Sequence, residues 1–407
     1  MVLGVRIREA RVNLNLSQRQ LAEGIVSKSF IGQIENGTAQ PSFRTLVLIA
    51  RRLGKPVSFF LERQDNSGLQ LSEAFLQLLN DLFDGGAYEK CVDLSREVLE
   101  VCDASSHERG RNHIKLLLGK SLFKLGRIPE AASILEEVYH CSGKRTVDTI
   151  ESLYWIANCH YRRGEYRLAY NKYQTVSRET QGRKRLLGIF YQSTLYLASS
   201  AFRLGNTEEA MRWYEFVYSD IFVDARTKID AGMSLSWVLF QKGDVSKALS
   251  MANVVKRLSL VHGKYQTSAI EHNIGIYFYS MGHCGHARYL WGKVLKDFEG
   301  SGHIYQQVSV LDEIALDCLW RKEPDEAEKY ALAALRLLMN VSHGVAHGRI
   351  YRTLGQVEYQ RGQFANARRW YDIALQLFEV LYAQREIFDT RTLIDKVREV
   401  LNDDSFH

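Results

Sequence analysis

The strongest constraint on the fold is a repeat of about 40 residues that runs through most of the chain. A glycine, here called the anchor, is followed by a short polar or mixed turn and, five residues after the glycine, by an alanine, which Cys91 replaces in the first unit. The anchors are Gly86, Gly126, Gly164, Gly205, Gly243, Gly282, Lys322 in place of glycine, and Gly362, at spacings of 40, 38, 41, 38, 39, 40 and 40 residues. A fixed period of this length is typical of stacked supersecondary units.

The residue pattern of each unit predicts two helices that pack closely together. From the second unit on, a small residue stands seven places before the anchor, and a packing residue, bulky or small, stands four places after the alanine. The small residue lets the helices approach, and the glycine ends the first helix in a left-handed turn. Pro129 and Pro324 suit the first turn of a second helix. The small residues are Gly119, Ala157, Ala198, Ser236, Gly275, Ala315 and Gly355, and their packing residues are Leu135, Tyr173, Tyr214, Ala252, Trp291, Ala331 and Tyr371.

This pattern resembles tetratricopeptide repeats, with about eight units over residues 73–378 and a capping helix at residues 379–402. The resemblance implies an all-α, right-handed superhelical solenoid whose concave face, lined by the first helices, holds an extended peptide or a partner helix. In related receptors groove asparagines hold the peptide backbone, a role that Asn158 matches. The peptide-binding candidates in this frame are Tyr154, Asn158, Tyr161, Gln192, Asp230, Trp237, His272, Asn273, Asp312, Arg352 and Gln356.

The excess positive charge of the chain lies in its first 63 residues. This segment holds ten Lys or Arg and four Asp or Glu, which accounts for the whole formal net charge of +6. The other 344 residues hold 43 bases and 43 acids. A small basic module joined to a large neutral body is typical of a nucleic-acid-binding protein, although a short segment can also be basic by chance.

Helix signals divide this basic segment into five short helices, at residues 3–13, 18–23, 28–35 and 45–53 and in a segment that starts at Pro56. Ser17 and Ser27 are predicted N-caps. Ile31 and Ile34, three residues apart, face inward, which places Lys28, Ser29, Gly32 and Gln33 on the opposite, exposed face of helix 28–35.

The run from Leu16-Ser17-Gln18 through Ile34-Glu35-Asn36-Gly37 to Ile49-Ala50 resembles the helix-turn-helix of Xre-type repressors over residues 3–62. The turn at residues 21–27 is one residue shorter than usual and resembles the variant in peptide-responsive regulators of the Rgg/PlcR/NprR/PrgX group. The resemblance implies a DNA-binding domain at residues 1–63, a linker at 64–72 and a recognition helix in the major groove. In the groove, Lys28 can donate hydrogen bonds to guanine, Gln33 can pair with adenine, and Ser29 can bond a base on either strand. The DNA-contact candidates are Ser17, Gln18, Arg19, Ser27, Lys28, Ser29, Gly32, Gln33 and Arg44.

The two halves together predict a cytoplasmic transcription regulator that is a homodimer and binds double-stranded operator DNA. A short signalling peptide in the concave groove would switch its DNA binding. Two alternatives remain open. One is an adaptor that binds a response-regulator protein and promotes its dephosphorylation. The other is a constitutive repressor whose repeats serve only for dimerisation.

Motifs for other chemistry are missing from the sequence. It contains no complete phosphate-binding loop, nucleophile elbow or His-Glu-x-x-His, so we predict no enzyme activity and no cofactor. His283-Cys284-Gly285-His286 falls on a repeat turn, where polar residues are routine, so we predict no metal site. Six cysteines without a Cys-x-x-Cys pair fit a reducing cytosol. No apolar run approaches the ~20 residues of a membrane span, and no signal peptide is apparent.

Overall fold

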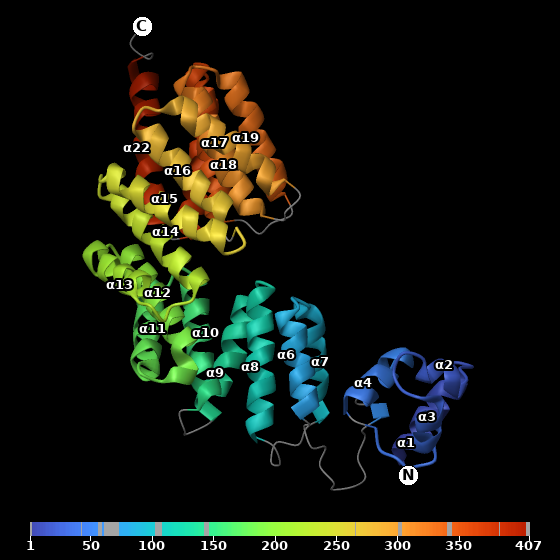
Figure 1. Cartoon of the computed structure of the whole chain (residues 1–407). Helices are drawn as coiled ribbons and strands as arrows, with labels where there is room; N and C mark the ends of the chain where they lie inside the picture. Colours follow the sequence, from blue (N-terminus) through green and yellow to red (C-terminus); the bar gives the residue numbers. More distant parts are fainter. Residues whose placement is uncertain are drawn as a thin grey trace. The chain divides into compact units, whose positions relative to one another are not determined.

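The computed structural model describes residues 2–41, 43–55, 59–60, 73–101, 108–141, 146–264, 266–299, 303–339, 344–381 and 383–403. The described residues form helices and contain no β-strand, as the sequence predicts. The chain divides into two compact units, residues 1–200 and 201–407, and the boundary falls inside one helix. Within each unit, consecutive helices pack side by side (Figure 1).

The first unit begins with a cluster of short helices. They are α1 (Val2–Asn13), α2 (Gln18–Ala22), α3 (Lys28–Glu35) and α4 (Phe43–Arg52). Ile7, Leu21, Ile31, Ile34 and Ile49 bury their side chains in its core, with 1% or less of their surface exposed. Of the predicted fifth helix, Phe59 and Phe60 are helical, and the rest lies outside the described residues, as does the predicted linker 64–72.

Helix pairs with the predicted 40-residue period make up the rest of the first unit. They are α6 (Glu73–Asp84) with α7 (Tyr88–Val101), α8 (Glu108–Lys124) with α9 (Ile128–Cys141), and α10 (Val147–Arg162) with α11 (Tyr166–Thr180). A short 3-10 helix at Lys184–Leu186 leads into α12 (Leu187–Arg203), which contains the boundary between the units. In each pair the anchor glycine separates the first helix from the second.

The second unit continues the same pattern. Its helices are α13 (Thr207–Ser219), α14 (Ala225–Gln241), α15 (Val245–Val261), α16 (Thr267–Ser280), α17 (Cys284–Phe298), α18 (Ile304–Trp320), α19 (Pro324–Leu338), α20 (Val345–Gln360), α21 (Phe364–Val380) and α22 (Gln384–Asp403). The predicted start of the last helix was wrong. We expected the last helix to span 379–402, but α21 continues through Val380 and α22 begins only at Gln384. The amphipathic pattern is continuous across this break, so periodicity alone did not reveal the turn.

The predicted contact between small and packing residues is present where glycine is the small residue. A Cβ built on Gly119 would lie 2.6 Å from Cγ of Leu135, and one on Gly355 would lie 2.4 Å from Cε1 of Tyr371. Real Cβ atoms do not approach other atoms so closely, so these positions accept only glycine without rearrangement. The sequence therefore identified the sites where the two helices of a pair lie closest.

The anchors adopt the left-handed conformation that the sequence predicts. Gly205 and Gly243, for example, have φ of 86° and 83°, and Lys322, which replaces glycine in the seventh unit, has φ of 61°. For a residue with a Cβ this conformation costs ~1–2 kcal/mol. Lys322 is therefore a strained position that the surrounding helix pair imposes.

Lys322→Gly is expected to stabilise the pair α18–α19. Glycine removes the left-handed strain but adds conformational entropy to the unfolded chain, so the net gain should be about 0.5–1 kcal/mol. Amide hydrogen exchange of the full chain should show slower local opening of α18 and α19. Gly362→Lys is the matched control, because it creates the strained arrangement at φ 75° and should accelerate exchange in α20 and α21. Unchanged or faster exchange in Lys322→Gly would contradict the strain argument.

Candidate DNA-binding face and ligand cavities

Serine caps fix the starts of α2 and α3. Ser17 Oγ accepts a hydrogen bond from the Gln20 amide at 3.2 Å, and Gln20 Oε1 accepts one from the Ser17 amide at 2.8 Å. Ser27 Oγ accepts from the Phe30 amide at 3.2 Å and lies 3.0 Å from Ser29 Oγ. Both predicted N-caps are therefore present, and their hydroxyl groups take part in local hydrogen bonds.

The α3 helix presents a polar face to solvent. Ile31 and Ile34 are buried in the domain core, whereas Lys28, Ser29 and Gln33 are exposed on the other side. Gly32 differs from the expected full exposure. It is half-buried, and a Cβ at this position would lie 3.6 Å from Oε1 of the Gln18 side chain. The outward surface of α3 is therefore formed by longer side chains on either side of Gly32.

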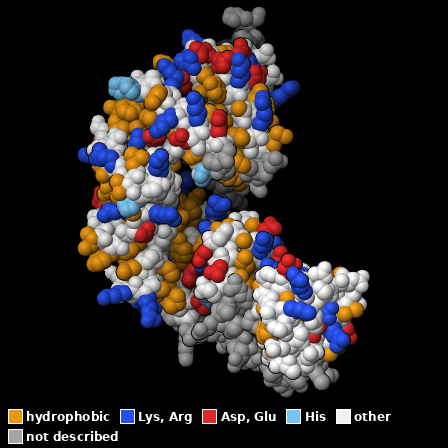
Figure 2. Space-filling model, turned by 45° about the vertical axis from the view of Figure 1, so that its right-hand side comes forward, with side chains coloured by type: hydrophobic (Ala, Val, Ile, Leu, Met, Phe, Trp, Pro, Cys, Tyr) orange, Lys and Arg blue, Asp and Glu red, His pale blue; other side chains and the backbone are white. Residues whose placement is uncertain are grey.

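The other side chains predicted to contact DNA differ in whether they are exposed to solvent. Arg19 on α2 is exposed. The Gln18 side chain points into the domain, where its Nε2 donates a hydrogen bond to Glu35 Oε2 at 2.8 Å. The Arg44 side chain lies outside the described residues. Basic side chains are visible at many points of the surface in Figure 2, interspersed with acidic and apolar ones.

A buried ion pair holds the first three helices together. Arg11 on α1 donates from Nε to Glu35 Oε1 at 2.6 Å and from Nη2 to Oε2 at 2.9 Å. Its Nη1 also donates to the Leu16 carbonyl at 2.7 Å. The Glu35 side chain is 1% exposed. Burial alone would raise the pKa of Glu35, but hydrogen bonds from Arg11 and Gln18 outweigh it and set this pKa below its ordinary value.

A cavity of about 500 Å³ lies on the first helices of three successive pairs in the first unit. Four predicted groove residues line it, namely Tyr154, Asn158, Tyr161 and Gln192. The other lining residues were not named among the candidates, although Phe123, Glu151, Trp155 and Tyr196 fall at concave positions of the repeat frame. They are Phe123, Lys124, Glu151, Trp155, Arg162, Gly188, Ile189 and Tyr196, which come from α8, α10 and α12. A shared face of α8, α10 and α12 is where the repeat frame places the ligand groove.

Hydrogen bonds and ring contacts organise the wall of this cavity. Asn158 is 7% exposed, and its Oδ1 accepts from the Tyr173 hydroxyl at 2.7 Å. The Tyr154 hydroxyl donates to Gln192 Oε1 at 3.3 Å. Tyr196 stacks on Tyr173 with ring centroids 5.6 Å apart. Burial, with the neighbouring Tyr196, raises the pKa of Tyr154, so its hydroxyl stays neutral and acts as a hydrogen-bonding group.

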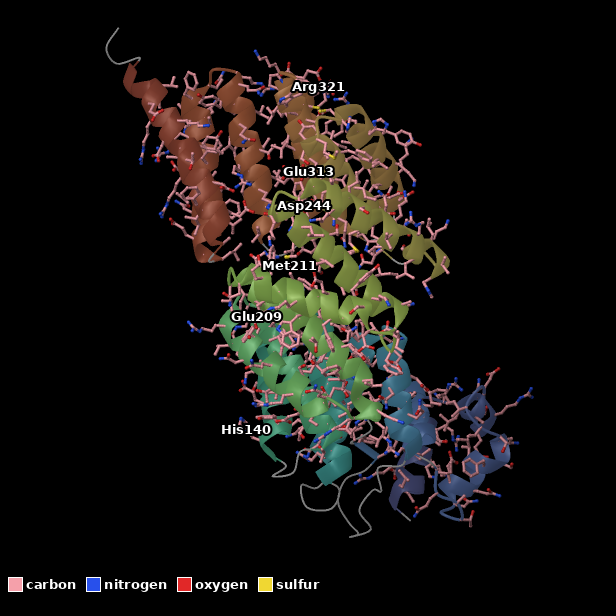
Figure 3. All side chains as sticks on the ribbon, turned by 60° about the vertical axis from the view of Figure 1, so that its left-hand side comes forward. His140, Glu209, Met211, Asp244, Glu313 and Arg321 are labelled. Atoms are coloured by element: carbon pink, nitrogen blue, oxygen red, sulfur yellow. The ribbon has the colours of Figure 1, made fainter. Side chains whose placement is uncertain are left out.

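In the second unit, two predicted groove acids have partners within the protein. Asp230 Oδ1 accepts from Gln266 Nε2 at 3.4 Å, and Asp312 Oδ1 accepts from the Thr353 hydroxyl at 2.6 Å. Burial raises the pKa of Asp312. Its unpredicted neighbour Glu313, labelled in Figure 3, has a pKa raised to about 7 by burial and by the Asp312 charge.

Other predicted groove residues of the second unit differ in their surroundings. Trp237 on α14 is half-buried against Phe240, with ring centroids 5.4 Å apart, and Asn273 on α16 is half-buried. Nε2 of His272 is enclosed and has no hydrogen-bond partner among the described residues. Burial lowers the pKa of His272 to about 4, so the ring is neutral near pH 7.

The Arg352 side chain forms an ion pair with the capping helix. We expected it to face a ligand carboxylate, but its Nη1 lies 2.7 Å from Glu386 Oε2 on α22, and Arg349 Nε donates to the same carboxylate group at 2.8 Å. Gln356 lines a second cavity, of about 330 Å³, with Leu316, Leu319, Trp320, Tyr359, Gln360, Tyr371, Leu393 and Lys396. Leu393 and Lys396 belong to α22, so the capping helix forms part of this cavity.

A regular sequence signal marks several lining residues that we missed. Lys124 and Arg162 stand two places before the anchors of the second and third units, and Trp320 and Gln360 occupy the same place in the seventh and eighth. The first two line the larger cavity and the last two line the smaller one. The candidates came from concave positions thirteen, ten, nine, six and three places before each anchor, so the position two places before it was left out.

The described residues contain no group of three or more His, Cys, Asp or Glu side chains arranged to hold a metal ion. None of their helices combines the length and the apolar character that crossing a membrane requires.

Two family models match the chain. Residues 7–60 match the helix-turn-helix model, and residues 306–379 match a tetratricopeptide repeat model. They confirm the predicted combination of an N-terminal helix-turn-helix domain with tetratricopeptide repeats. No curated protein sequence matches the chain.

Solved structures of Rap proteins have a similar fold. A Rap protein complexed with Competence and Sporulation Factor aligns over 81% of this chain and 98% of its own, with a TM-score of 0.56 and 13% identity. The Rap conjugation gene regulator of plasmid pLS20, complexed with a Phr peptide, aligns over 95% and 97%, with a TM-score of 0.54 and 14% identity. The apo form of RapI aligns over 81% and 97%, with a TM-score of 0.52 and 11% identity. At these identities the likeness establishes the fold.

Proposed function

We propose that the chain is a transcription regulator that binds operator DNA through α3 and a short signalling peptide in the cavity on α8, α10 and α12. The observation that carries the proposal is the presence, in one chain, of an exposed polar α3 face and a cavity formed by the first helices of three successive repeats. Two proteins of similar fold were solved with a factor or peptide bound. We further propose a cytoplasmic homodimer, because a helix-turn-helix dimer reads two successive half-sites.

The polar face of α3 has the chemistry for base recognition. In such a domain the recognition helix enters the major groove, where Gln33 can pair with adenine and Lys28 with guanine. Arg19 on α2 would contact the phosphate backbone, which positions the domain without reading sequence. The caps at Ser17 and Ser27 hold the starts of α2 and α3 in the positions that such contacts need.

The cavity has groups that can bind both the backbone and the side chains of a peptide. Asn158 and Gln192 can bond backbone amides, and the rings of Tyr154, Tyr161 and Tyr196 can bury side chains. Its volume of about 500 Å³ lies in the range of small-ligand sites, which suits a few residues of a longer peptide. Peptide binding would alter the packing of three repeats at once, and we propose that this change is transmitted to DNA binding.

The test starts from an operator selected by the full-length protein from random double-stranded DNA. Gln33→Ala is expected to weaken binding to that operator about 5- to 150-fold and to relax selection at one base pair. Gln181→Ala, an exposed glutamine in the repeats, is the matched control and should leave affinity unchanged. Peptides recovered from a random heptapeptide library should then change operator affinity, and Gln192→Leu should weaken that effect.

Each alternative function predicts a different result in the same experiments. A constitutive repressor would bind its operator equally well with and without every recovered peptide. An adaptor would select no operator but would bind a response-regulator receiver domain directly. Either pattern would overturn the proposed peptide-switched regulator.

A further inference from the structure

Two basic side chains at the larger cavity are positioned to bind an anionic ligand. Lys124 ends α8 and Arg162 ends α10, and both side chains are exposed to solvent at the cavity. Lys124 Nζ lies 5.5 Å from the Trp155 ring centroid, and Arg162 Cζ lies 6.0 Å from the Phe123 ring centroid. Within the described part of the chain, neither cation has a carboxylate at ion-pair distance.

The acid that lines the cavity is already neutralised. Glu151 Oε1 lies 2.7 Å from Lys120 Nζ, and Lys120 is not a lining residue. Lys120 also lies over the rings of Phe83 and Trp155, 4.6 Å and 5.9 Å from their centroids. The lining groups therefore leave a net positive charge from Lys124 and Arg162, and a positively charged cleft attracts anionic ligands.

The aromatic wall places this charge beside an apolar surface. Trp155 and Phe123 hold the two cations over their ring faces, which limits the directions that the ammonium and guanidinium groups can take. Tyr154, Tyr161 and Tyr196 add rings on the same wall. A ligand that fits both features carries a carboxylate next to bulky apolar side chains, because Arg in particular binds carboxylates in fork geometry.

We propose that the cavity selects peptides with a carboxylate within reach of Lys124 and Arg162, either on an Asp or Glu side chain or at a free C-terminus. This inference rests on the proposed peptide-binding function and adds the chemical class of the ligand. The competing explanation is that both cations only stabilise the C-terminal ends of their helices, where positive charge is favourable. The two explanations differ in what the cations do to peptide selection.

The test uses the full-length protein and four heptapeptide pools of matched composition. One pool contains Asp and Glu with an amidated C-terminus, and one contains Asn and Gln in their place with a free C-terminus. A third pool has neither carboxylate, and a fourth has both. Bound peptides are eluted and quantified by mass spectrometry. We expect at least one carboxylate pool to be retained about 10-fold better than the pool without carboxylates, with a preference that weakens as salt rises. The first two pools distinguish side-chain from terminal carboxylates.

Three variants connect this preference to the two cations. The double variant Lys124→Met/Arg162→Met should lose the carboxylate preference but still retain peptides, because Met preserves most of the apolar stem. Lys124→Arg/Arg162→Lys should keep the preference. Arg178→Gln removes an exposed cation from the last turn of α11, a second helix that does not line the cavity, and should change nothing. Melting temperatures of all variants report any effect at the helix ends.

The outcomes separate this inference from the function on which it rests. Equal retention of all four pools by the wild-type protein would overturn the carboxylate preference while peptide binding stands. A preference that survives in the double Met variant would overturn the role of Lys124 and Arg162. Retention of no pool would overturn peptide binding itself and the inference with it.

Discussion

Arg11→Met should destabilise the N-terminal domain by about 3–5 kcal/mol, the usual cost of removing one partner of a buried ion pair. The variant leaves the Glu35 carboxylate, 1% exposed, with a single hydrogen bond from Gln18. It also removes the donor to the Leu16 carbonyl in the turn between α1 and α2. Amide exchange in α1, α2 and α3 of the full chain should accelerate by about two orders of magnitude or more.

A double variant separates the lost charge pair from lost packing. Arg11→Met/Glu35→Leu removes both charges, and replacement of a buried pair by apolar residues is often neutral. We therefore expect the double variant to recover most of the lost stability, although Gln18 also loses its acceptor. Exchange in α7–α11 should stay unchanged in both variants. A single variant as stable as the wild type would show that the ion pair contributes little.

The same ion pair predicts how the domain responds to acid. The pKa of Glu35 is lower in the folded domain than in the unfolded chain, so the unfolded chain binds more protons as the pH falls. The stabilisation is complete above the ordinary carboxyl pKa of ~4.3 and is lost as the pH drops through the folded-state value. Glu35→Gln should abolish this part of the acid sensitivity, which chemical denaturation between pH 3 and about pH 6 would measure.

Local steric rules made much of the fold predictable. The left-handed anchors and the close contacts of Gly119 with Leu135 and Gly355 with Tyr371 follow from residue size at fixed spacing, which a sequence shows directly. Gly4 shows the limit of such rules. A Cβ at Gly4 would lie 2.2 Å from the Ile34 carbonyl oxygen. This contact joins α1 to α3, and because the two residues are far apart in the sequence, no local residue spacing predicts it. The Arg11–Glu35 pair is hidden for the same reason.

For the candidate sites, the sequence predicted which helix face a residue lies on better than which partner its side chain binds. The repeat frame brought Tyr154, Asn158 and Gln192 to one cavity, because successive first helices share that face. It did not reveal that Arg352 pairs with Glu386, since the register of the capping helix depends on a turn that the amphipathic pattern conceals. Nor did the sequence reveal that the side-chain amide of Gln18 bonds Glu35, because an exposed position and an internal partner give the same sequence signal.

Gly275→Ala and Gly292→Ala, the same substitution in neighbouring helices of one pair, are expected to have opposite effects. A Cβ on Gly275 in α16 would lie 2.4 Å from Nε1 of Trp291, whose side chain is 1% exposed. The indole has little freedom to withdraw, because Nε1 also donates to the His272 carbonyl at 3.4 Å. Overpacking of this kind costs ~1–3 kcal/mol. A Cβ on Gly292 in α17 would meet no atom within 4 Å, so alanine there should stabilise the helix by about 1 kcal/mol.

Local hydrogen exchange in α16 and α17 of the full chain would measure both effects. The expected difference between the two variants, about 2–4 kcal/mol, is large enough to resolve despite the size of the chain. Gly275→Ala/Trp291→Leu adds a direct test of the cause, because a smaller side chain opposite position 275 should relieve the clash and leave mainly the cost of the lost indole. If Gly275→Ala alone matched or exceeded the stability of the wild type, the two helices would have enough freedom to separate, and close packing would not explain the glycine at this position.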